Sequence, residues 1–309
     1  MRNLFTLIVL QCCFIGFSQT ERLYYFVEKD SLLGVKNQNG KIIVPAKLSL
    51  SAGPYENGRE IKSKIFMVDF MRYYDRNGKF LFGPYLTGEG PDSFEEGFIR
   101  YEENKKVGLF NDWGEKIIPA KYDWLSSINF GFAQFCNGCY FDYSKDEEHA
   151  PLVGGTWGFV GKNGIEIQPT NKRNHPKDFE TEKHEFIPYQ FEYNDKEKEI
   201  LAFFEKRKQE IIQINGYNCD GKTIYFEIIE KPTEFDPFYK IKTFELCDNY
   251  LRGSHYYDDF KNFKVSKDGK KFYVTLIDLV NHKDYSEYVE YKILVDKWIN
   301  RKLSLKIDN

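Results

Sequence analysis

One short segment of the chain has residue types and a spacing that could do chemistry, Cys136-Asn137-Gly138-Cys139. A redox dithiol normally lies at the start of a helix, which lowers the cysteine pKa, whereas the residues around this segment are typical of strands. Asn-Gly favours a two-residue hairpin turn, and the residues flanking such a turn lie about 5.5 Å apart between Cα atoms, within disulfide range. We expect a disulfide across a hairpin turn, with free thiols and a redox or metal-binding role as the alternatives.

The remaining cysteines and acidic clusters give weaker signals. Cys219 and Cys247 could form a second disulfide, but a zinc site would need a further ligand pair that the chain does not offer in a usual spacing. We interpret Asp146-Glu147-Glu148-His149 and His255-Tyr256-Tyr257-Asp258-Asp259 as surface loops, and Gly88-Glu89-Gly90 lacks the strand-turn-helix setting of a phosphate loop. Since no hydrolase or metalloprotease signature is present either, the sequence predicts no catalytic residue, no metal site and no cofactor.

Charge and composition narrow the class of partner. The net charge is −3, from 44 basic and 47 acidic residues that are well mixed along the chain. A nucleic-acid binder normally shows a concentrated basic face, so that class is not expected. Aromatic residues make up 17% of the chain, which favours pleated, half-buried surfaces over helices. Most of these rings are expected in the core, and any exposed ones could stack on a ligand.

The elements that must position these residues are repeats. Residues 33–47 and 107–121 align without a gap, sharing two glycines, an Asn, an Ile and a Pro-Ala-Lys ending. A third copy spans 157–169, a degenerate copy spans 73–82, and an insertion around 144–154 lengthens the last interval. The residues that define the repeats are Gly34, Gly40, Pro45, Gly78, Gly108, Gly114, Pro119, Trp157, Gly158, Gly164 and Pro169.

The physics of one repeat can be read from its residue order. Asn/Asp-x-x-Gly joins two short apolar stretches, and glycine there supplies the positive φ of a tight turn. The prolines are expected to end the second strand, because proline cannot donate to the ladder. An aromatic-x-x-Gly element, as in Phe94-Glu95-Glu96-Gly97, leads into a third strand. The glycines inside strands, at 34, 108 and 158, suggest a bulge or the close approach of another backbone or a ring.

A single three-stranded unit buries too little surface to stand alone, so neighbouring units must pack on one another. The sequence therefore predicts a mainly β chain, in which a tandem array of three-stranded antiparallel repeats, solenoid-like, occupies residues 21–170. These repeats resemble the WG-repeat family, named for a Trp-Gly pair that is present here as Trp157-Gly158 and is substituted in Leu33-Gly34 and Val107-Gly108. The resemblance implies a β-rich array used for interaction, without shared catalytic residues.

The repeat pattern stops after Pro169. Residues 171–185 are polar and are expected to form a linker, and residues 186–309 are expected to form a β-rich α+β domain. A helix is predicted over 195–209, capped by Asn194 or Asp195. Strands are predicted over 222–229, 239–246 and 271–280, with a hairpin turn at 267–270. Residues 288–299 fit both periods, and a strand is preferred.

The N-terminus predicts export. A basic start, an apolar stretch from Leu4 to Phe17 and small residues before Gln19 form the pattern of a secretory signal peptide over residues 1–18. The apolar stretch is too short to span a bilayer, which needs about 20 residues, and no later stretch is apolar enough. A retained anchor and lipoprotein cleavage before Cys12 or Cys13 are the alternatives. The signal resembles those of Gram-negative bacteria, which implies the periplasm, the cell surface or the medium.

These observations lead to an expected function. We expect an exported, non-catalytic binding or scaffold protein whose β-repeat surface contacts an envelope protein or a glycan. The alternatives are an envelope enzyme, acting through the cysteine pair or an unrecognised C-terminal site, and a spacer that presents the C-terminal domain. The segment Cys136–Cys139 lies within the only stretched repeat interval, just before its insertion, so it is the first place to look for a specialised site.

Overall fold

The computed structural model describes residues 21–29, 32–48, 57–69, 71–88, 90–144, 150–215, 223–247, 250–253, 262–281 and 286–307. The expected signal peptide, Cys219 and the loops 146–149 and 255–259 lie outside these ranges. Strands make up 50% of the described residues and helices 13%, which confirms the mainly β class. The chain divides into two compact units, the first comprising residues 1–61, 68–70 and 76–78 and the second the rest.

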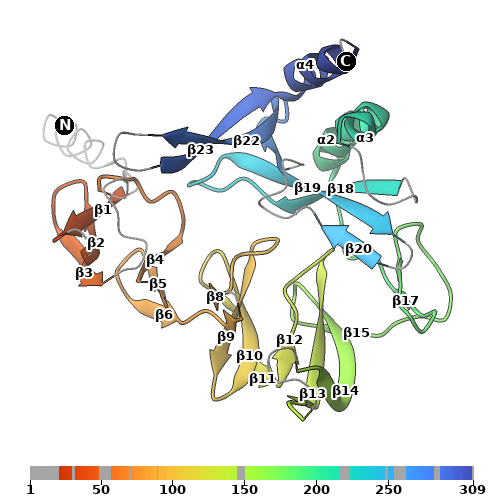
Figure 1. Cartoon of the computed structure of the whole chain (residues 1–309), viewed down its shortest axis with the longest axis horizontal. Helices are drawn as coiled ribbons and strands as arrows, with labels where there is room; N and C mark the ends of the chain where they lie inside the picture. Colours follow the sequence, from red (N-terminus) through yellow and green to blue (C-terminus); the bar gives the residue numbers. More distant parts are fainter. Residues whose placement is uncertain are drawn as a thin grey trace, which may run out of the picture. The chain divides into compact units, whose positions relative to one another are not determined.

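Each of the four repeat copies forms its own small antiparallel sheet (Figure 1). The first sheet holds β1 (Leu23–Glu28), β2 (Leu32–Asn37) and β3 (Ile42–Leu48), and the second holds β4 (Ile65–Asp69), β5 (Arg72–Asp75) and β6 (Phe80–Phe82). The third holds β9 (Phe98–Glu103), β10 (Lys106–Asn111) and β11 (Lys116–Tyr122). The fourth holds β12 (Trp124–Leu125), β13 (Phe132–Phe141), β14 (Leu152–Gly161) and β15 (Glu166–Ile167). The short strands β7 (Leu86–Thr87) and β8 (Gly90–Pro91) pair between the second and third sheets in sequence.

The turn that joins the last two strands of each repeat is built by its polar residue and its glycine. In the third repeat the side-chain oxygen of Asn111 accepts from the backbone N–H of Trp113 at 3.1 Å and of Glu115 at 2.8 Å. Gly114 then adopts φ +81°, a left-handed conformation that costs other residues about 1–2 kcal/mol. The glycines at 40, 78 and 164 adopt the same conformation, so the predicted turns are confirmed.

The glycines inside strands lie beneath aromatic rings of the neighbouring strand. Gly108 is the cross-strand partner of Tyr101, and a Cβ on Gly108 would lie 2.6 Å from Tyr101 Cε1 and 2.8 Å from the Ala120 nitrogen. Gly34 pairs in the same way with Phe26, and Gly158 pairs with Phe135. The predicted close approach is confirmed, and both a ring and a backbone make it.

The prediction that proline ends the second strand is wrong for Pro45 and Pro119, which lie inside β3 and β11. Leu33 pairs with Lys47 and Val35 with Val44, so Pro45 and its neighbour bulge out opposite the in-strand glycine. A proline in a bulge of an edge strand has no ladder bond to donate, and the strand continues beyond it. Pro169, by contrast, follows the end of β15.

Successive repeats of the second unit share apolar cores. Val107, Leu109 and Ile118 of the third repeat are buried with Phe135 and Val160 of the fourth. The turn glycines make the closest approach: a Cβ on Gly114 would lie 2.7 Å from Ile65 Cγ2 and 2.9 Å from Leu81 Cδ1 of the second repeat. Repeat packing therefore requires glycine at the turn for lack of space as well as for its φ angle.

The C-terminal part of the second unit combines a larger antiparallel sheet with three helices (Figure 1). The sheet runs β18 (Thr223–Glu230), β19 (Phe238–Cys247), β21 (Asn262–Ser266), β22 (Phe272–Asn281) and β23 (Ser286–Leu294), with β20 (Tyr250–Gly253) also pairing with β19. The helices are α2 (Asp195–Lys206), α3 (Lys208–Asn215) and α4 (Val295–Ile307). Three predicted strands and the turn at 267–270 are confirmed, whereas residues 288–299 divide between β23 and α4.

Two further features concern the helices and the expected linker. Asn194 caps α2 in a capping box with Glu197, as one of the two predicted caps. The segment expected to be a linker contains β16 (Phe179–Glu180), which pairs with β17 (Phe186–Ile187). There the buried Asp178 accepts from the backbone N–H of Asn174, His175 and Tyr189. In the described ranges, no helix is long and apolar enough to cross a membrane.

Candidate functional site

The Cys136–Cys139 segment lies in the middle of a long two-stranded arm rather than at a turn. β13 and β14 are ten residues each and pair from Phe132 opposite Gly161 to Phe141 opposite Leu152. The predicted hairpin turn at Asn137-Gly138 is therefore wrong. A type I′ turn requires positive φ at both central residues, and only Gly138 has it, at +79°. The facing strand supplies Gly154 and Gly155 at +73° and +72°, so both strands bend together and stay paired.

The disulfide itself is present. Cys136 and Cys139 are bonded, with their Cα atoms 6.1 Å apart. Residues three apart in a regular strand point to opposite faces, so the left-handed Gly138 between them is what lets the two sulfur atoms meet. A Cβ on Gly155 of the facing strand would lie 2.6 Å from Cys136 Sγ. Only glycine therefore fits beside the disulfide.

Asp123, between β11 and β12, ties this segment to the array. Its carboxylate accepts from the Gly138 N–H at 2.7 Å and contacts Lys106 Nζ at 2.5 Å. Its own N–H donates to the Cys136 carbonyl at 3.0 Å. The hydrogen bonds from Gly138 and Lys106 hold the pKa of the Asp123 carboxyl below its usual value, so the group is a permanent anion at neutral pH. Asp123 thus anchors the Cys136–Cys139 segment through hydrogen bonds to Gly138 and Cys136.

Large aromatic side chains are exposed along this arm. Tyr140 is 63% exposed, Tyr143 is 60% exposed and Trp157 is 39% exposed, with Phe141 also exposed between the two tyrosines. The Trp157 indole N–H donates to the Gly154 carbonyl at 2.9 Å, and its ring lies 5.6 Å from the Trp124 ring. Trp157 is therefore held in one orientation while much of its surface faces solvent. Exposed rings of this size commonly mark interaction sites when they gather.

Glycine backbone is exposed on both strands near these rings. Gly138, Gly154 and Gly155 are all exposed, and a Cβ on Gly138 would lie 3.7 Å from the Gly155 Cα. Tyr140 Cε1 lies 3.6 Å from the Cβ position of Gly154, whose carbonyl also holds Trp157. Trp157 and Tyr140 thus both lie next to Gly154, and we call these two residues with Gly138, Gly154 and Gly155 the aromatic slot.

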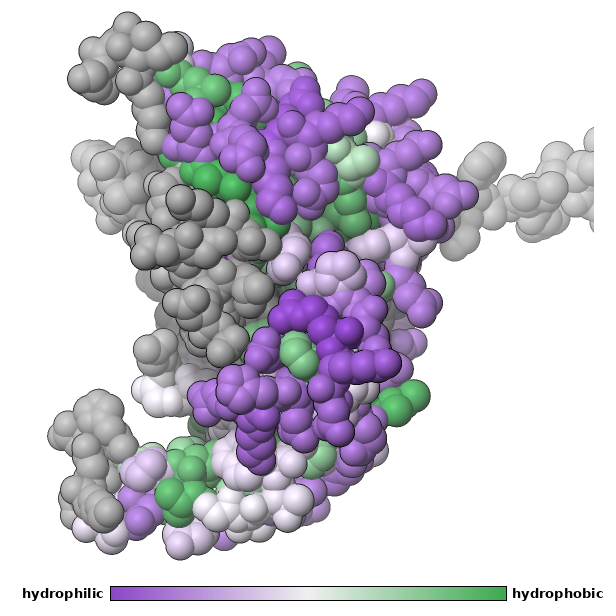
Figure 2. Space-filling view, turned by 90° about the vertical axis from the view of Figure 1, so that its right-hand side faces the viewer, coloured by the Kyte–Doolittle hydropathy of each residue, from purple (hydrophilic) through white to green (hydrophobic). Residues whose placement is uncertain are grey.

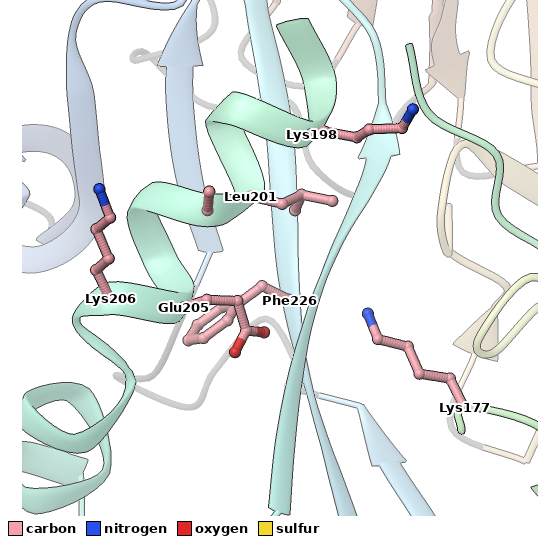
Figure 3. Close-up of a pocket in the computed structure, with 7 residues that line it drawn as sticks. Lys177, Lys198, Leu201, Glu205, Lys206 and Phe226 are labelled. Atoms are coloured by element: carbon pink, nitrogen blue, oxygen red, sulfur yellow. The ribbon is translucent and has the colours of Figure 1, made fainter. Parts of the chain in front are cut away.

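A second candidate is a shallow pocket of about 550 Å³ beside α2 (Figure 3). Leu201 and Phe226 form an apolar floor, and Lys177 and Lys198 lie at its rim. Lys177 is already engaged, since its Nζ lies 2.7 Å from the fully buried Glu227 carboxylate. The hydroxyls of Tyr189 and Tyr193 donate to the same carboxylate at 2.6 Å each. Burial and the Glu227 charge raise the pKa of both tyrosines, so this network is a closed structural unit.

The chemical groups of the arm can be described directly. Cys136 is fully buried, and both cysteines lie in β13 rather than at the start of a helix. Within the described ranges, no group of three His, Cys, Asp or Glu side chains could hold a metal ion. What the arm offers is exposed rings, backbone polar groups and neutral polar side chains.

Sequence reasoning found only part of this site. It singled out Cys136, Cys139 and Trp157, and the structure brings these three together, with Trp157 directly opposite Cys136. It missed Tyr140, Gly154 and Gly155, although Gly154-Gly155 within the insertion was a readable sign of an unusual backbone. Comparisons with family models, with curated proteins and with solved structures found no match for this chain.

Proposed function

We propose that this chain is a non-catalytic binding protein whose β-repeat array holds the β13–β14 arm as a rigid contact surface. The observation that carries the proposal is the gathering of exposed aromatic side chains on one disulfide-bonded hairpin. Aromatic residues supply most of the binding energy in many interfaces. A ring that is already ordered before binding loses little conformational freedom on binding.

The proposed setting is outside the cell of synthesis. The N-terminal pattern of residues 1–18 supports export, and a disulfide persists in the periplasm, on the cell surface or in the medium. The resemblance of the repeats to the WG-repeat family supports an interaction role. The proposed partner is a component of the cell envelope, either a protein or a glycan.

The test is capture of an envelope component by the immobilised full mature chain. The informative variants are Trp157→Ala and Tyr140→Ala, because both rings belong to the aromatic slot. The matched control is Trp113→Ala, a residue of the same type in the β10–β11 turn with 41% exposure, against 39% for Trp157. We expect the wild type and Trp113→Ala to capture the same component and the two slot variants to lose it. Equal capture by all four proteins would contradict the proposal.

A further inference from the structure

We infer that the aromatic slot binds a neutral glycan, with one pyranose ring lying over the glycines next to Trp157 and Tyr140. This inference rests on the proposed function and specifies its ligand class. The slot has the three features that sugar binding needs: a flat ring surface, a floor without side chains and neutral polar groups at the edge.

The ring surface comes first. One face of a pyranose presents C–H groups that carry partial positive charge, and these pack against the negative face of an aromatic ring. Trp157 is held by its indole N–H on the Gly154 carbonyl, and Tyr140 contacts the same glycine from the other strand. Both side chains therefore lie next to Gly154, one held by its carbonyl and one close to its Cα.

The floor is open because three glycines meet there. No side chain can cover the backbone at Gly138, Gly154 or Gly155, and all three are exposed. Gly155 is confined to glycine by Cys136 Sγ, which a Cβ would approach to 2.6 Å. A ligand ring can thus reach the peptide groups next to the two aromatic rings, which is a use of glycine seen where a ligand approaches a backbone closely.

The edge of the slot is polar and uncharged. Asn137 and Thr156 are cross-strand partners next to Gly138 and Gly155, and both are exposed. Their side-chain polar atoms and the Tyr140 hydroxyl have no hydrogen-bond partner in the part of the chain that the structure describes, so they are available to sugar hydroxyls. The charged groups that contact this segment, Asp123 and Lys106, are paired with each other. Figure 2 shows pale residues of intermediate hydropathy at the lower edge of its face.

These features favour a glycan over a protein partner. A protein hot spot is a desolvated apolar pocket filled by an apolar anchor, whereas the surface next to Trp157 and Tyr140 includes the exposed backbone of three glycines. A sugar matches that alternation, because its faces are apolar and its edge carries hydroxyls. A neutral sugar also matches the lack of an unpaired charge among the described residues of the slot.

The experiment titrates the full mature chain with cello-, laminari-, manno- and chito-oligosaccharides, followed by calorimetry and tryptophan fluorescence. We expect saturable binding of at least one of them. Trp157→Ala and Tyr140→Ala should each weaken it about tenfold or more, as the loss of one hot-spot ring does. Trp113→Ala should leave it unchanged. Trp157→Phe keeps a ring at the same place and should retain most of the affinity, which separates stacking from a general disturbance of the hairpin.

Two outcomes overturn the inference. If none of the oligosaccharides binds, the ligand class is wrong; should envelope capture still depend on Trp157, the proposed function stands with a protein partner. If an oligosaccharide binds but Trp157→Ala and Tyr140→Ala bind it as tightly as the wild type, the aromatic slot is not its site. A thiol titration that finds Cys136 and Cys139 oxidised in every variant establishes that the arm is intact in the comparison.

Discussion

Cys136 and Trp157 are direct cross-strand partners, one on β13 and the other on β14. Directly paired residues project to the same face of a sheet, so the fully buried cysteine lies beside the exposed tryptophan. Restraining Cys136 therefore restrains the backbone that positions Trp157. This relationship links the stability of the arm to its capacity to bind, and it can be tested from both sides.

Loss of the disulfide should destabilise the arm by about 2 kcal/mol, the chain-entropy value for so short a loop. The comparison is Cys136→Ser combined with Cys139→Ser against the wild type, in urea unfolding monitored by tryptophan fluorescence. Identical unfolding midpoints for the double variant and the wild type would show that the disulfide does not contribute.

The turn glycines offer a matched pair for the packing of repeats. Gly40 and Gly114 have nearly the same φ, +82° and +81°, but a Cβ on Gly40 meets nothing within 4 Å, whereas one on Gly114 meets Ile65 and Leu81. Gly40→Ala should cost about 1 kcal/mol through backbone strain alone. Gly114→Ala should cost at least about 1 kcal/mol more, because the side chains of the second repeat must shift. Thermal unfolding of both variants measures the difference, and equal losses would refute the role assigned to repeat packing.

Glu96 should be among the least replaceable residues of the array. Its buried carboxylate accepts from the N–H groups of Phe130 at 2.6 Å and Gly131 at 3.0 Å, and Lys162 Nζ lies 2.9 Å away. Glu96→Ala leaves buried donors and a lysine without their partner, which costs about 3–5 kcal/mol.

The control for Glu96 is Glu103→Ala, which removes an exposed ion pair with Lys116 at 3.4 Å. An exposed pair of this kind contributes about 0–1 kcal/mol. Urea unfolding of the two variants should therefore separate them clearly. A loss at Glu96 as small as that at Glu103 would mean that water replaces the missing carboxylate.

The free energy of unfolding of the second unit should fall as the pH rises from about 4 to about 6, because Asp112 ionises over this range. Burial, together with the nearby Glu230 charge, raises the pKa of Asp112 to about 6. Since the folded pKa lies above the unfolded one, the stabilising contribution of the protonated group is present below about pH 4 and is lost as the pH rises through 6. Asp112→Asn should therefore be more stable than the wild type above pH 6, by roughly 1–2 kcal/mol after allowance for partial solvation.

The control for Asp112 is a carboxyl with the opposite shift. Hydrogen bonds from Ser266 and Lys270 lower the pKa of Asp268, so Asp268→Asn should lose stability at neutral pH rather than gain it. Unfolding curves collected across this pH range decide the matter. An Asp112→Asn variant that tracks the wild type at every pH would show that Asp112 ionises freely in the folded chain.

Local features of this protein are determined by the sequence alone. Asn111 and Gly114 form their turn because a side-chain acceptor and a positive φ are requirements of four adjacent residues. Glycine inside a strand, as at Gly108, predicts a close approach by another group. Asn194 caps α2 through bonds within one turn. Repetition adds further certainty, since the same local requirement recurs in each copy and reveals the tandem array.

Other features were decided only by the tertiary structure. Asn137-Gly138 is a strong local turn signal, but Gly154 and Gly155 across the strand accept the same bend, and ten residues of pairing outweigh the turn. Residues 288–299 fit both periods, and burial of Trp298 and Ile299 in the C-terminal core makes their end helical. The aromatic slot exists because the pairing of β13 with β14 places both Trp157 and Tyr140 next to Gly154. A local pattern reports which conformations a segment can adopt, whereas the partner across the sheet determines which of them buries the apolar surface and leaves the rings outside.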